Sequence, residues 1–337
     1  MKLDSSGDPS DLQEALIELL RSNPEDYFSI QTIADKIGCD DRIAMEAIGQ
    51  LSRWGYRFET DSHSHFRFSS APDAIFPIEI RYNLKTGYIG QNIVARASVT
   101  STNDIARELA EQGAPEGTVV IAEKQVKGRG RMGRSWHSPA KKGLWLTLIL
   151  RPEVPSAQAP SLSILMALSL SEILHSSYKL ESGIKWPNDC QIDGRKVTGI
   201  LTELSAELDR VDYVLVGMGI NVNLARSDFP PELHKIATSI RMEYGEEIDR
   251  IGFLRMLLER IEKNYEIFKK KSLKPFLPKI KKHSVLLGKR IKLLKGRKLI
   301  QAVAHDFDAD GALIAKRKGE LLRVTAGEVS VIKADRD

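Results

Sequence analysis

The stretch from Gln125 to Trp136, Q-V-K-G-R-G-R-M-G-R-S-W, constrains this chain more than any other part of its sequence. Three glycines alternate with three arginines between Gly128 and Arg134. Glycine permits left-handed backbone and the close approach of a ligand, and arginine carries a planar fork of donors that fits phosphate and carboxylate. A segment with so many charges and glycines does not belong to a core. The stretch therefore predicts a loop that closes over an anion.

The same glycines match the spacing of the dinucleotide-binding fingerprint, Gly128-x-Gly130-x-x-Gly133. That fingerprint needs a strand before it and a helix after it. Here the next regular segment is the apolar run 144–150, which reads as a strand, and no helix intervenes to carry a pyrophosphate. The pattern therefore disfavours a dinucleotide site. Taken alone, these residues also fit a solvated basic loop, so other segments must decide what the loop binds.

Length and charge divide the chain into parts. A length of 337 residues allows two or three domains. The formal net charge of +5 conceals a net of −7 over residues 1–76, zero over 77–268 and +12 over 269–337, which indicates units with different partners. Because the sequence has no apolar run of 18 residues and no signal peptide, and its two cysteines lie far apart, we expect a cytoplasmic protein with reduced thiols and no membrane segment.

Residues 1–76 are predicted to form a small helical domain. Apolar residues recur at helical spacing in three segments and alternate in the two short segments that follow. The helices are expected over residues 11–21, 30–37 and 42–54, and the strands over 56–60 and 65–68. Three helices and a two-stranded ribbon in this order resemble a winged helix-turn-helix domain. Pro72 and Pro77 mark the linker that follows it.

The third of these helices has the wrong charge for DNA. A recognition helix approaches phosphates and needs Lys or Arg. Here the helix opens with Asp40 and Asp41 and carries Glu46, against Arg42 and Arg53. We therefore favour a structural or regulatory remnant over a working DNA-binding domain.

Residues 82–280 are predicted to form an α+β domain of helices and mostly consecutive strands. Ser101 and Asp104 have the spacing of a helix capping box, and Asp193-Gly194 predicts a hairpin turn. The strands are expected over 95–99, 118–123, 144–150, 197–204 and 212–222, and the helices from 101, over 161–178 and over 250–269. Lys185 precedes Trp186-Pro187, and proline excludes helix there. We therefore expect Lys185 to be fixed on a short extended segment.

Residues 284–334 are predicted to form a small β-barrel. Short strands are expected over 290–294, 299–305, 312–316 and 321–324, and tight turns separate them. The basic face of this unit is suited to nucleic acid or to an acidic protein.

Five stretches, in this order, resemble the biotin protein ligases. They are Ser101-Thr-Asn103, the loop from Gly128 to Arg134, Lys185-Trp-Pro-Asn-Asp189, Gly194-Arg-Lys196 with Gly199-Ile-Leu201, and Gly217-x-Gly-Ile-Asn221. The loop and the Lys-Trp-Pro-Asn-Asp stretch are the most specific. The match covers residues 82–280 firmly. The two ends resemble the bacterial ligase–repressors, which carry a winged helix, a class II synthetase-like catalytic domain and an SH3-like barrel.

The resemblance implies an ATP-dependent, AMP-forming ligase. Biotin's carboxylate attacks the α-phosphate of ATP, with Mg²⁺, and the resulting biotinyl-AMP then acylates a lysine of the biotin carboxyl carrier protein of acetyl-CoA carboxylase or a related carboxylase. Two anions must meet, so arginines, lysine and metal have to neutralise them, and a closing loop has to exclude water. Lipoate ligation is the alternative acyl-adenylating chemistry, and the arginine–glycine loop argues for biotin.

The resemblance also implies roles for individual residues. Lys185 and Arg131 are the implied catalytic residues, with Lys185 between the biotin carboxylate and the α-phosphate. The implied biotin-binding residues are Ser101, Thr102, Asn103, Gln125, Arg129, Gly130, Arg131 and Lys185. The implied ATP- and adenylate-binding residues are Gly128, Arg129, Arg131, Lys185, Asn221, Asn223 and Phe229, the last by stacking on adenine. No protein ligand for metal is identified, so Mg²⁺ is expected to enter with the ATP phosphates.

The first unit contains the main departures from the family pattern. Relatives that repress transcription place Ser and Arg at the start of the third helix and a glycine in the wing tip. This chain has Asp40-Asp41-Arg42 and His63-Ser-His65 there, which weakens the implied DNA partner. Thr100 also stands where many relatives have Asp. A homodimer through the middle sheet is expected from the resemblance alone.

Overall fold

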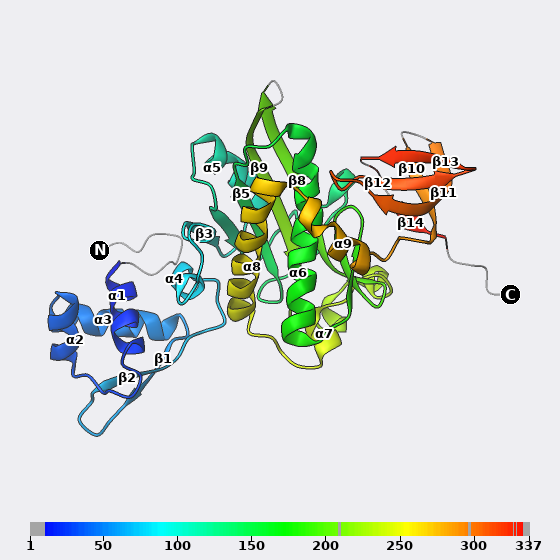
Figure 1. Cartoon of the computed structure of the whole chain (residues 1–337). Helices are drawn as coiled ribbons and strands as arrows, with labels where there is room; N and C mark the ends of the chain where they lie inside the picture. The colour runs from blue at the N-terminus through cyan, green and yellow to red at the C-terminus, as the bar shows by residue number, and fades with distance from the viewer. Residues whose placement is uncertain (1–10, 208–209, 296–297, 326, 328, 333–337) are drawn as a thin grey trace. The chain divides into compact units, whose positions relative to one another are not determined.

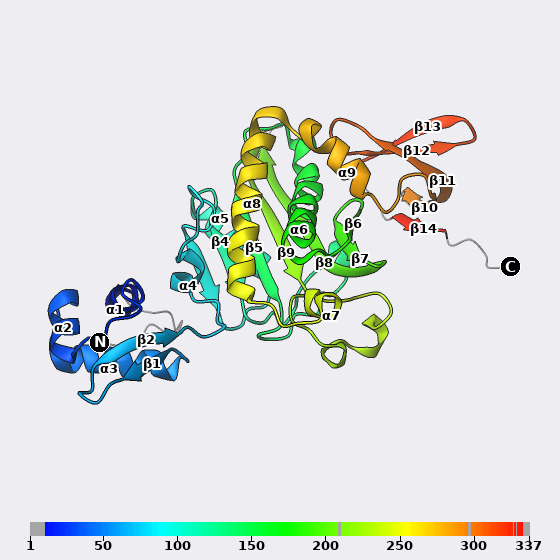
Figure 2. The ribbon, with the colours of Figure 1, turned by 60° about the horizontal axis from the view of Figure 1, so that its bottom comes forward.

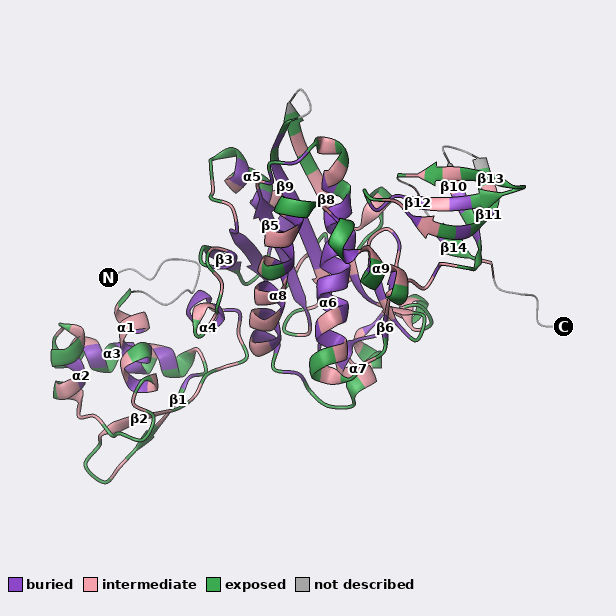
Figure 3. Ribbon diagram, viewed as in Figure 1, coloured by how far each residue is buried: buried purple, intermediate pink, exposed green. Residues whose placement is uncertain are grey.

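The computed structural model describes residues 11–207, 210–295, 298–325, 327 and 329–332. The chain divides into two compact units, Met1–Asn83 and Leu84–Asp337 (Figure 1). Buried side chains form a separate core in each of them (Figure 3). The start of the second unit at Leu84 lies two residues from the predicted start of the catalytic domain at residue 82.

The first unit contains three helices and a two-stranded antiparallel ribbon where the sequence predicts them. Its elements are α1 (Asp11–Arg21), α2 (Ile30–Ile37), α3 (Asp41–Arg53), β1 (Arg57–Thr60), β2 (Phe66–Ser70) and α4 (Pro77–Arg81). The apolar stripes of α1 to α3 meet in one core, which includes Leu16, Ile33 and Leu51. Ser29 caps α2 through a hydrogen bond from Thr32 N (3.1 Å), and a left-handed Gly38 ends it, as expected for these residue types.

Helix α4 lies where the sequence predicted a linker, so that prediction was wrong. Pro77 occupies the first turn of the helix, a position that proline favours, and Ile78 joins the core of the first unit. The buried carboxylate of Glu79 accepts two hydrogen bonds from Arg21 (2.8 and 3.0 Å) and one from the Tyr56 hydroxyl (2.8 Å). These buried polar contacts, which have no local sequence signal, bind α4 to the first unit.

The second unit is built on a seven-stranded sheet in the order β3-β4-β5-β9-β8-β7-β6. Its strands are β3 (Ile93–Arg96), β4 (Val119–Ala122), β5 (Leu144–Leu150), β6 (Ser182–Lys185), β7 (Asp189–Ile192), β8 (Arg195–Glu207) and β9 (Arg210–Ile220). Among the described strand pairs of this sheet, β3–β4 is parallel and the others are antiparallel, as expected for a mixed α/β architecture built from consecutive strands. The predicted hairpin turn at Asp193-Gly194 joins β7 to β8, and both residues have positive φ (49° and 72°).

Helices cover the sheet. Helix α5 (Thr102–Glu111) packs on β4, β5 and β9 through Ala106 and Ala110. Helices α6 (Leu162–Tyr178) and α8 (Arg250–Lys271) lie side by side across the sheet in both views (Figures 1 and 2). The apolar segment Ser156–Tyr178 is long enough to cross a membrane, but 78% of its most apolar window is buried inside the protein, as in a core helix. The remaining helices are α7 (Ile240–Tyr244), α9 (Leu277–His283) and the 3₁₀ turns Arg131–Gly133, Ser156–Ser161, Arg226–Asp228, Pro231–Leu233 and Lys274–Phe276.

The chain ends in a separate five-stranded antiparallel sheet in the order β13-β12-β11-β10-β14. Its strands are β10 (Arg290–Lys295), β11 (Lys298–Phe307), β12 (Leu313–Arg317), β13 (Glu320–Val324) and β14 (Val329–Val331). Four of these strands lie where the sequence predicts them. The fifth, β14, was missed because its three residues are too few to give an alternating pattern.

Candidate active site

A cavity of about 430 Å³ opens in the second unit, at one end of the central strands. Its walls come from segments far apart in the sequence: the start of α5, the glycine–arginine loop, the β6–β8 region and the end of β9. The described residues Gly327 and Val329 of the C-terminal sheet region also line it. The predicted site residues that line it are Ser101, Thr102, Asn103, Gln125, Arg129, Gly130, Arg131, Lys185, Asn221 and Phe229.

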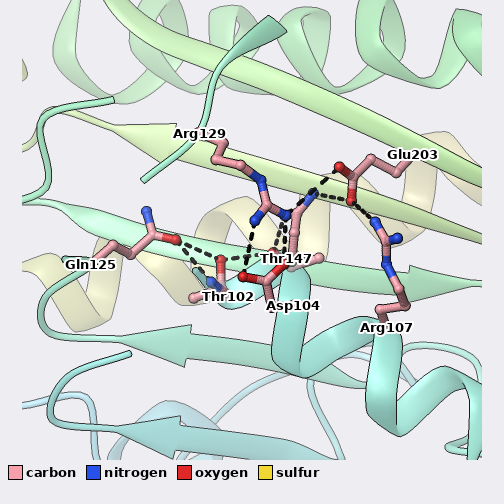
Figure 4. A network of polar contacts seen from close by, with 8 residues as sticks. Thr102, Asp104, Arg107, Gln125, Arg129, Thr147 and Glu203 are labelled. Carbon is pink, nitrogen blue, oxygen red and sulfur yellow. Dashed lines mark hydrogen bonds and ion pairs between the residues drawn. The ribbon is translucent and has the colours of Figure 1, made fainter. Parts of the chain in front are cut away.

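The first wall is a buried polar network at the start of α5 (Figure 4). Gln125 Oε1 accepts hydrogen bonds from Thr102 N (2.9 Å) and Thr102 Oγ1 (3.1 Å). Thr147 Oγ1, on β5, contacts Thr102 Oγ1 (2.8 Å) and Asn103 Oδ1 (2.7 Å). Asn103 fits against the backbone of β9 because Gly217 has no side chain, and a Cβ there would lie 3.1 Å from Asn103 Cγ. Hydrogen bonds therefore hold the side chains of this wall in place.

Ser101 is the N-cap of α5, but the predicted capping box does not form. Its side chain makes no capping hydrogen bond. The Asp104 carboxylate binds the Arg129 guanidinium instead, which raises the pKa of Arg129. The capping-box spacing was therefore misleading, because the Asp104 carboxylate pairs with Arg129 and does not cap the helix.

The second wall is the glycine–arginine loop and the tryptophan that ends it. The loop forms a small hairpin in which Gly130 N donates to Arg134 O (2.7 Å) and Trp136 N to Gly128 O (2.8 Å). The Trp136 indole lies against Gly199 on β8 and Gly219 on β9, where any side chain would collide with the ring. The buried Trp136 Nε1 has no hydrogen-bond partner among the described residues.

The third wall contains two lysines. Lys185 is the last residue of β6, as predicted, and a cis peptide bond joins Trp186 to Pro187 directly after it. Lys196, on β8, also lines the cavity, and its Nζ lies 2.8 Å from Asp189 Oδ2. No role was predicted for Lys196 from the sequence. Its position two residues after the hairpin turn, on a strand that pairs with β7, was the signal that could have identified it.

Two predicted site residues lie outside the cavity lining. The Asn223 side chain is buried and forms a pair of hydrogen bonds with the backbone of Ile248, to its oxygen (2.8 Å) and from its nitrogen (2.9 Å). Asn223 therefore fixes the loop and does not line the cavity, contrary to the expectation that it faces the nucleotide. Gly128 is buried at the base of the loop, where a Cβ would collide with the Trp136 carbonyl and the Ser138 hydroxyl.

Asn221 and Phe229 line the cavity but also have structural contacts. Asn221 Nδ2 donates to Thr238 O (2.9 Å), so its oxygen is the group left to face a ligand. Phe229 packs with Trp145 and Leu224 in a small apolar cluster. Arg131 reaches across the cavity, where it donates to Asn188 Oδ1 (3.1 Å) and to the Gly327 carbonyl (3.0 Å). The C-terminal sheet region therefore contacts the loop directly.

Comparison with known proteins agrees with this geometry. Residues 95–221 match the model of the Biotin/lipoate A/B protein ligase family, and residues 286–331 match the Biotin protein ligase C terminal domain. The chain is also 35% identical over 322 residues to the bifunctional ligase/repressor BirA of Bacillus subtilis, a match that spans 96% of this chain and 99% of the relative. The chain belongs to the biotin protein ligase family.

Two further relatives match a smaller share of this chain. The biotin–[acetyl-CoA-carboxylase] ligase of Mycobacterium tuberculosis is 31% identical over 72% of this chain and 90% of its own length. A solved structure of the biotin protein ligase of Aquifex aeolicus, in complex with biotin and ATP, superposes with a TM-score of 0.63 at 32% identity, over 72% of this chain and all of that one.

Proposed function

We propose that this chain is an ATP-dependent ligase that forms biotinyl-5'-AMP and transfers the biotin to a lysine of a biotin carboxyl carrier protein. The proposal rests on one observation: the start of α5, the arginine loop, Lys185 and Lys196 all line the same cavity. The complex of the Aquifex relative with biotin and ATP supports both substrates. The relatives named as acetyl-CoA-carboxylase ligases support a carboxylase carrier as acceptor.

In the first step, a biotin carboxylate oxygen attacks the α-phosphorus of ATP. A new P–O bond forms, the bond to the β-phosphate oxygen breaks, and pyrophosphate leaves with that electron pair. Both reactants are anions, so the barrier falls when fixed cations face the developing charge. Lys185 and Arg131 line the cavity and supply cations there, and Lys196 also lines it, paired with Asp189. Mg²⁺ bound to the ATP phosphates would offset part of their charge.

In the second step, the amine of the carrier lysine attacks the acyl carbon of biotinyl-AMP. The amide bond forms, the C–O bond to the phosphate breaks, and AMP and a proton are released. The mixed anhydride is sensitive to water, so the covering loop must exclude water until the carrier arrives. Arg129, Gly130 and Arg131 belong to that cover.

The two ends of the ligand are assigned to different walls. The wall of Ser101, Thr102, Asn103 and Gln125 presents fixed polar groups and binds biotin. Asn221 and Phe229 line another part of the same cavity and bind the nucleotide, with Phe229 against adenine.

The test is biotin-dependent exchange of labelled pyrophosphate into ATP. Lys185→Ala is expected to lower this exchange by roughly 10² or more, the scale of losing one electrostatic stabiliser. Lys196→Ala measures how far the second lysine shares that role. Lys235→Ala removes an exposed lysine outside the cavity and serves as the matched control. Exchange that needs lipoate instead of biotin would move the chain to lipoate ligation, and normal exchange in Lys185→Ala would refute its catalytic role.

The C-terminal sheet is the proposed docking site for the carrier. We assign residues 284–334 to an SH3-like barrel, because five short antiparallel strands and a bulge in β11 support that fold. Lys316, Arg317 and Lys318 are exposed at its β12–β13 turn and attract an acidic carrier. Reversing all three to Glu is expected to raise KM for the carrier and leave pyrophosphate exchange unchanged. Reversal of the exposed Lys263, Lys270 and Lys271 of α8 is the charge-matched control, and equal losses in both half-reactions would refute the docking role.

A second candidate function is transcriptional regulation through the first unit. The match to a ligase/repressor over 96% of this chain favours it, and α1 to α3 with the β1–β2 ribbon fit a winged helix-turn-helix. The charges of α3 oppose it, since Asp41 and Glu46 stand in a helix that would have to approach phosphates. A gel shift at low salt with biotinyl-AMP present decides between a DNA-binding unit and a structural remnant. We also propose a cytoplasmic homodimer, which sedimentation analysis with and without biotinyl-AMP would test.

A further inference from the structure

The glycine–arginine loop is attached to the second unit at two levels. At its base, backbone groups hold it: Val126 N donates to Val99 O (2.8 Å) and Lys127 N to Thr100 O (2.9 Å). Farther out, the chain passes through glycines and a 3₁₀ turn, which supply little stiffness of their own. The position of this outer part therefore depends on its side-chain contacts.

Arg129 makes one of these contacts, with Asp104 on α5 (Figure 4). Its Nη1 lies 2.9 Å from Asp104 Oδ2 and its Nη2 lies 2.6 Å from Asp104 Oδ1. Two nitrogens on two oxygens of one carboxylate form a bidentate pair, the strongest geometry for these groups. Glu203 Oε1, on β8, is a more distant neighbour at 3.9 Å.

Asp104 is well fixed to act as an anchor. It lies in the first turn of α5, where the helix dipole favours a negative charge. Helix α5 is itself held on the sheet by Ala106 and Ala110. The three residues that precede Asp104, Ser101 to Asn103, form the polar wall of the cavity. The Asp104–Arg129 pair therefore ties the loop to the wall that the loop covers.

Glu203 supports the same arrangement from the sheet. Its Oε2 accepts hydrogen bonds from Asn103 Nδ2 (3.1 Å) and Arg107 Nη2 (2.8 Å). Because Glu203 lies 3.9 Å from Arg129 and Asp104 lies 2.6 Å from it, Asp104 is the main partner of Arg129.

We propose that Asp104 is a positioning residue: through Arg129 it holds the loop across the Ser101–Asn103 wall and keeps biotin and its adenylate enclosed. The identity of the enclosed ligand rests on the function proposed above, whereas the tether between loop and helix does not. Arg129 then acts on the reaction chiefly by fixing the loop.

The experiment compares Asp104→Asn with wild type by two independent readouts. The first is limited thermolysin digestion without ligand, since Val126 and Met132 are 63% and 67% exposed apolar residues in the loop. Loss of the pair is expected to raise the cleavage rate in the loop about fivefold, the factor that corresponds to ~1 kcal/mol for a partly exposed ion pair. The second is KM for biotin in pyrophosphate exchange, expected to rise by a similar factor with kcat nearly unchanged.

Three further variants separate positioning from general damage. Glu108→Gln makes the same charge change at an exposed position of α5 and is expected to behave as wild type. Asp104→Glu keeps the charge and is expected to restore most of the protection. Arg129→Gln is expected to match Asp104→Asn, and the double variant to be no worse than either single one, with the thermal midpoint of all variants near that of wild type.

The proposal is overturned if Asp104→Asn is cleaved at the wild-type rate, or if the effects of Asp104→Asn and Arg129→Gln add. Absence of biotin-dependent exchange in wild type would instead remove the proposed function, and the digestion would still decide whether Asp104 tethers the loop.

Discussion

Substitution of Gly219 by Ala tests how the sheet shapes the cavity. An alanine Cβ at this position would lie 2.6 Å from Cε2 and 2.8 Å from Cδ1 of the Trp136 indole. Carbon atoms that are not bonded pack at about 3.5–4.0 Å, so the ring must move by roughly 1 Å. Gly199 also packs against this ring, since a Cβ there would lie 2.7 Å from Trp136 Cζ3. The indole therefore has to move away from the strands, and it lines the cavity there.

The expected cost follows from this displacement. Overpacking of a well-packed site costs typically about 1–3 kcal/mol. If the displaced ring takes up ligand space, the affinity for biotinyl-AMP falls by roughly 5- to 150-fold, since each 1.4 kcal/mol is a factor of ten. If the complex with biotinyl-AMP keeps its wild-type geometry, the substitution instead lowers the free energy of unfolding of the ligand-free protein.

Isothermal titration with biotinyl-AMP measures the affinity, and urea unfolding measures the stability. The decisive comparison is a double-mutant cycle with Trp136→Ala, which removes the ring that the new methyl group meets. In that background, Gly219→Ala is expected to cost less than about 0.5 kcal/mol. An equal cost with and without the indole would refute the steric argument, as would unchanged affinity and stability in the single variant.

Three stability predictions follow from single sites, each measured by urea unfolding. Arg250→Met leaves the carboxylate of Glu123 without its fully buried guanidinium partner (2.9 Å) and is expected to cost about 3–5 kcal/mol; a cost below 1 kcal/mol would contradict this. Glu172→Gln is expected to cost about 1–2 kcal/mol at pH 7. Burial alone would raise the pKa of Glu172, but hydrogen bonds from Lys279 and Asn264 lower it below the ordinary 4.5. Glu172 therefore stabilises the folded protein above about that pH, and this stabilisation is lost as the pH falls through the lower folded pKa. A difference in unfolding free energy between the variant and wild type that persists in acid would contradict the assignment. Gly49→Ala adds a methyl group in the interior of α3 with no atom within 4 Å, and is expected to stabilise the first unit by about 0.5–1 kcal/mol.

The elements that could be predicted from sequence are those with a strong local signal. Helix α2 has an apolar stripe, a serine cap and a glycine stop within its own residues, and it begins and ends where predicted. The turn between β7 and β8 was equally clear, because Asp-Gly tolerates the positive φ that a tight hairpin needs. Helix α4 and strand β14 lacked such signals. Each is short, and α4 is bound to the first unit by the buried Glu79, whose partners Arg21 and Tyr56 are far away in sequence.

The candidate site was predictable as a set of segments but less so as a set of side chains. Lys185 and Gln125 line the cavity as expected. Asn223 does not, because its amide forms hydrogen bonds with the backbone of Ile248, a residue 25 positions away in the sequence. Lys196 was overlooked for a similar reason: its place in the cavity depends on the pairing of β8 with β7.

The glycine–arginine loop is the clearest case in which the sequence could not predict the role of each residue. Its arginines at 129 and 131 are equivalent in sequence, each between glycines or close to one, and each was expected to meet the same ligand. The fold separates them, because α5 presents Asp104 to Arg129 whereas Asn188 and Gly327 receive hydrogen bonds from Arg131. An arginine already paired with a carboxylate attracts a further anion less strongly, since the pair carries little net charge. Arg129 is therefore suited to hold the loop, a role that arises from its pairing with Asp104 in the fold and that its position in the sequence does not reveal.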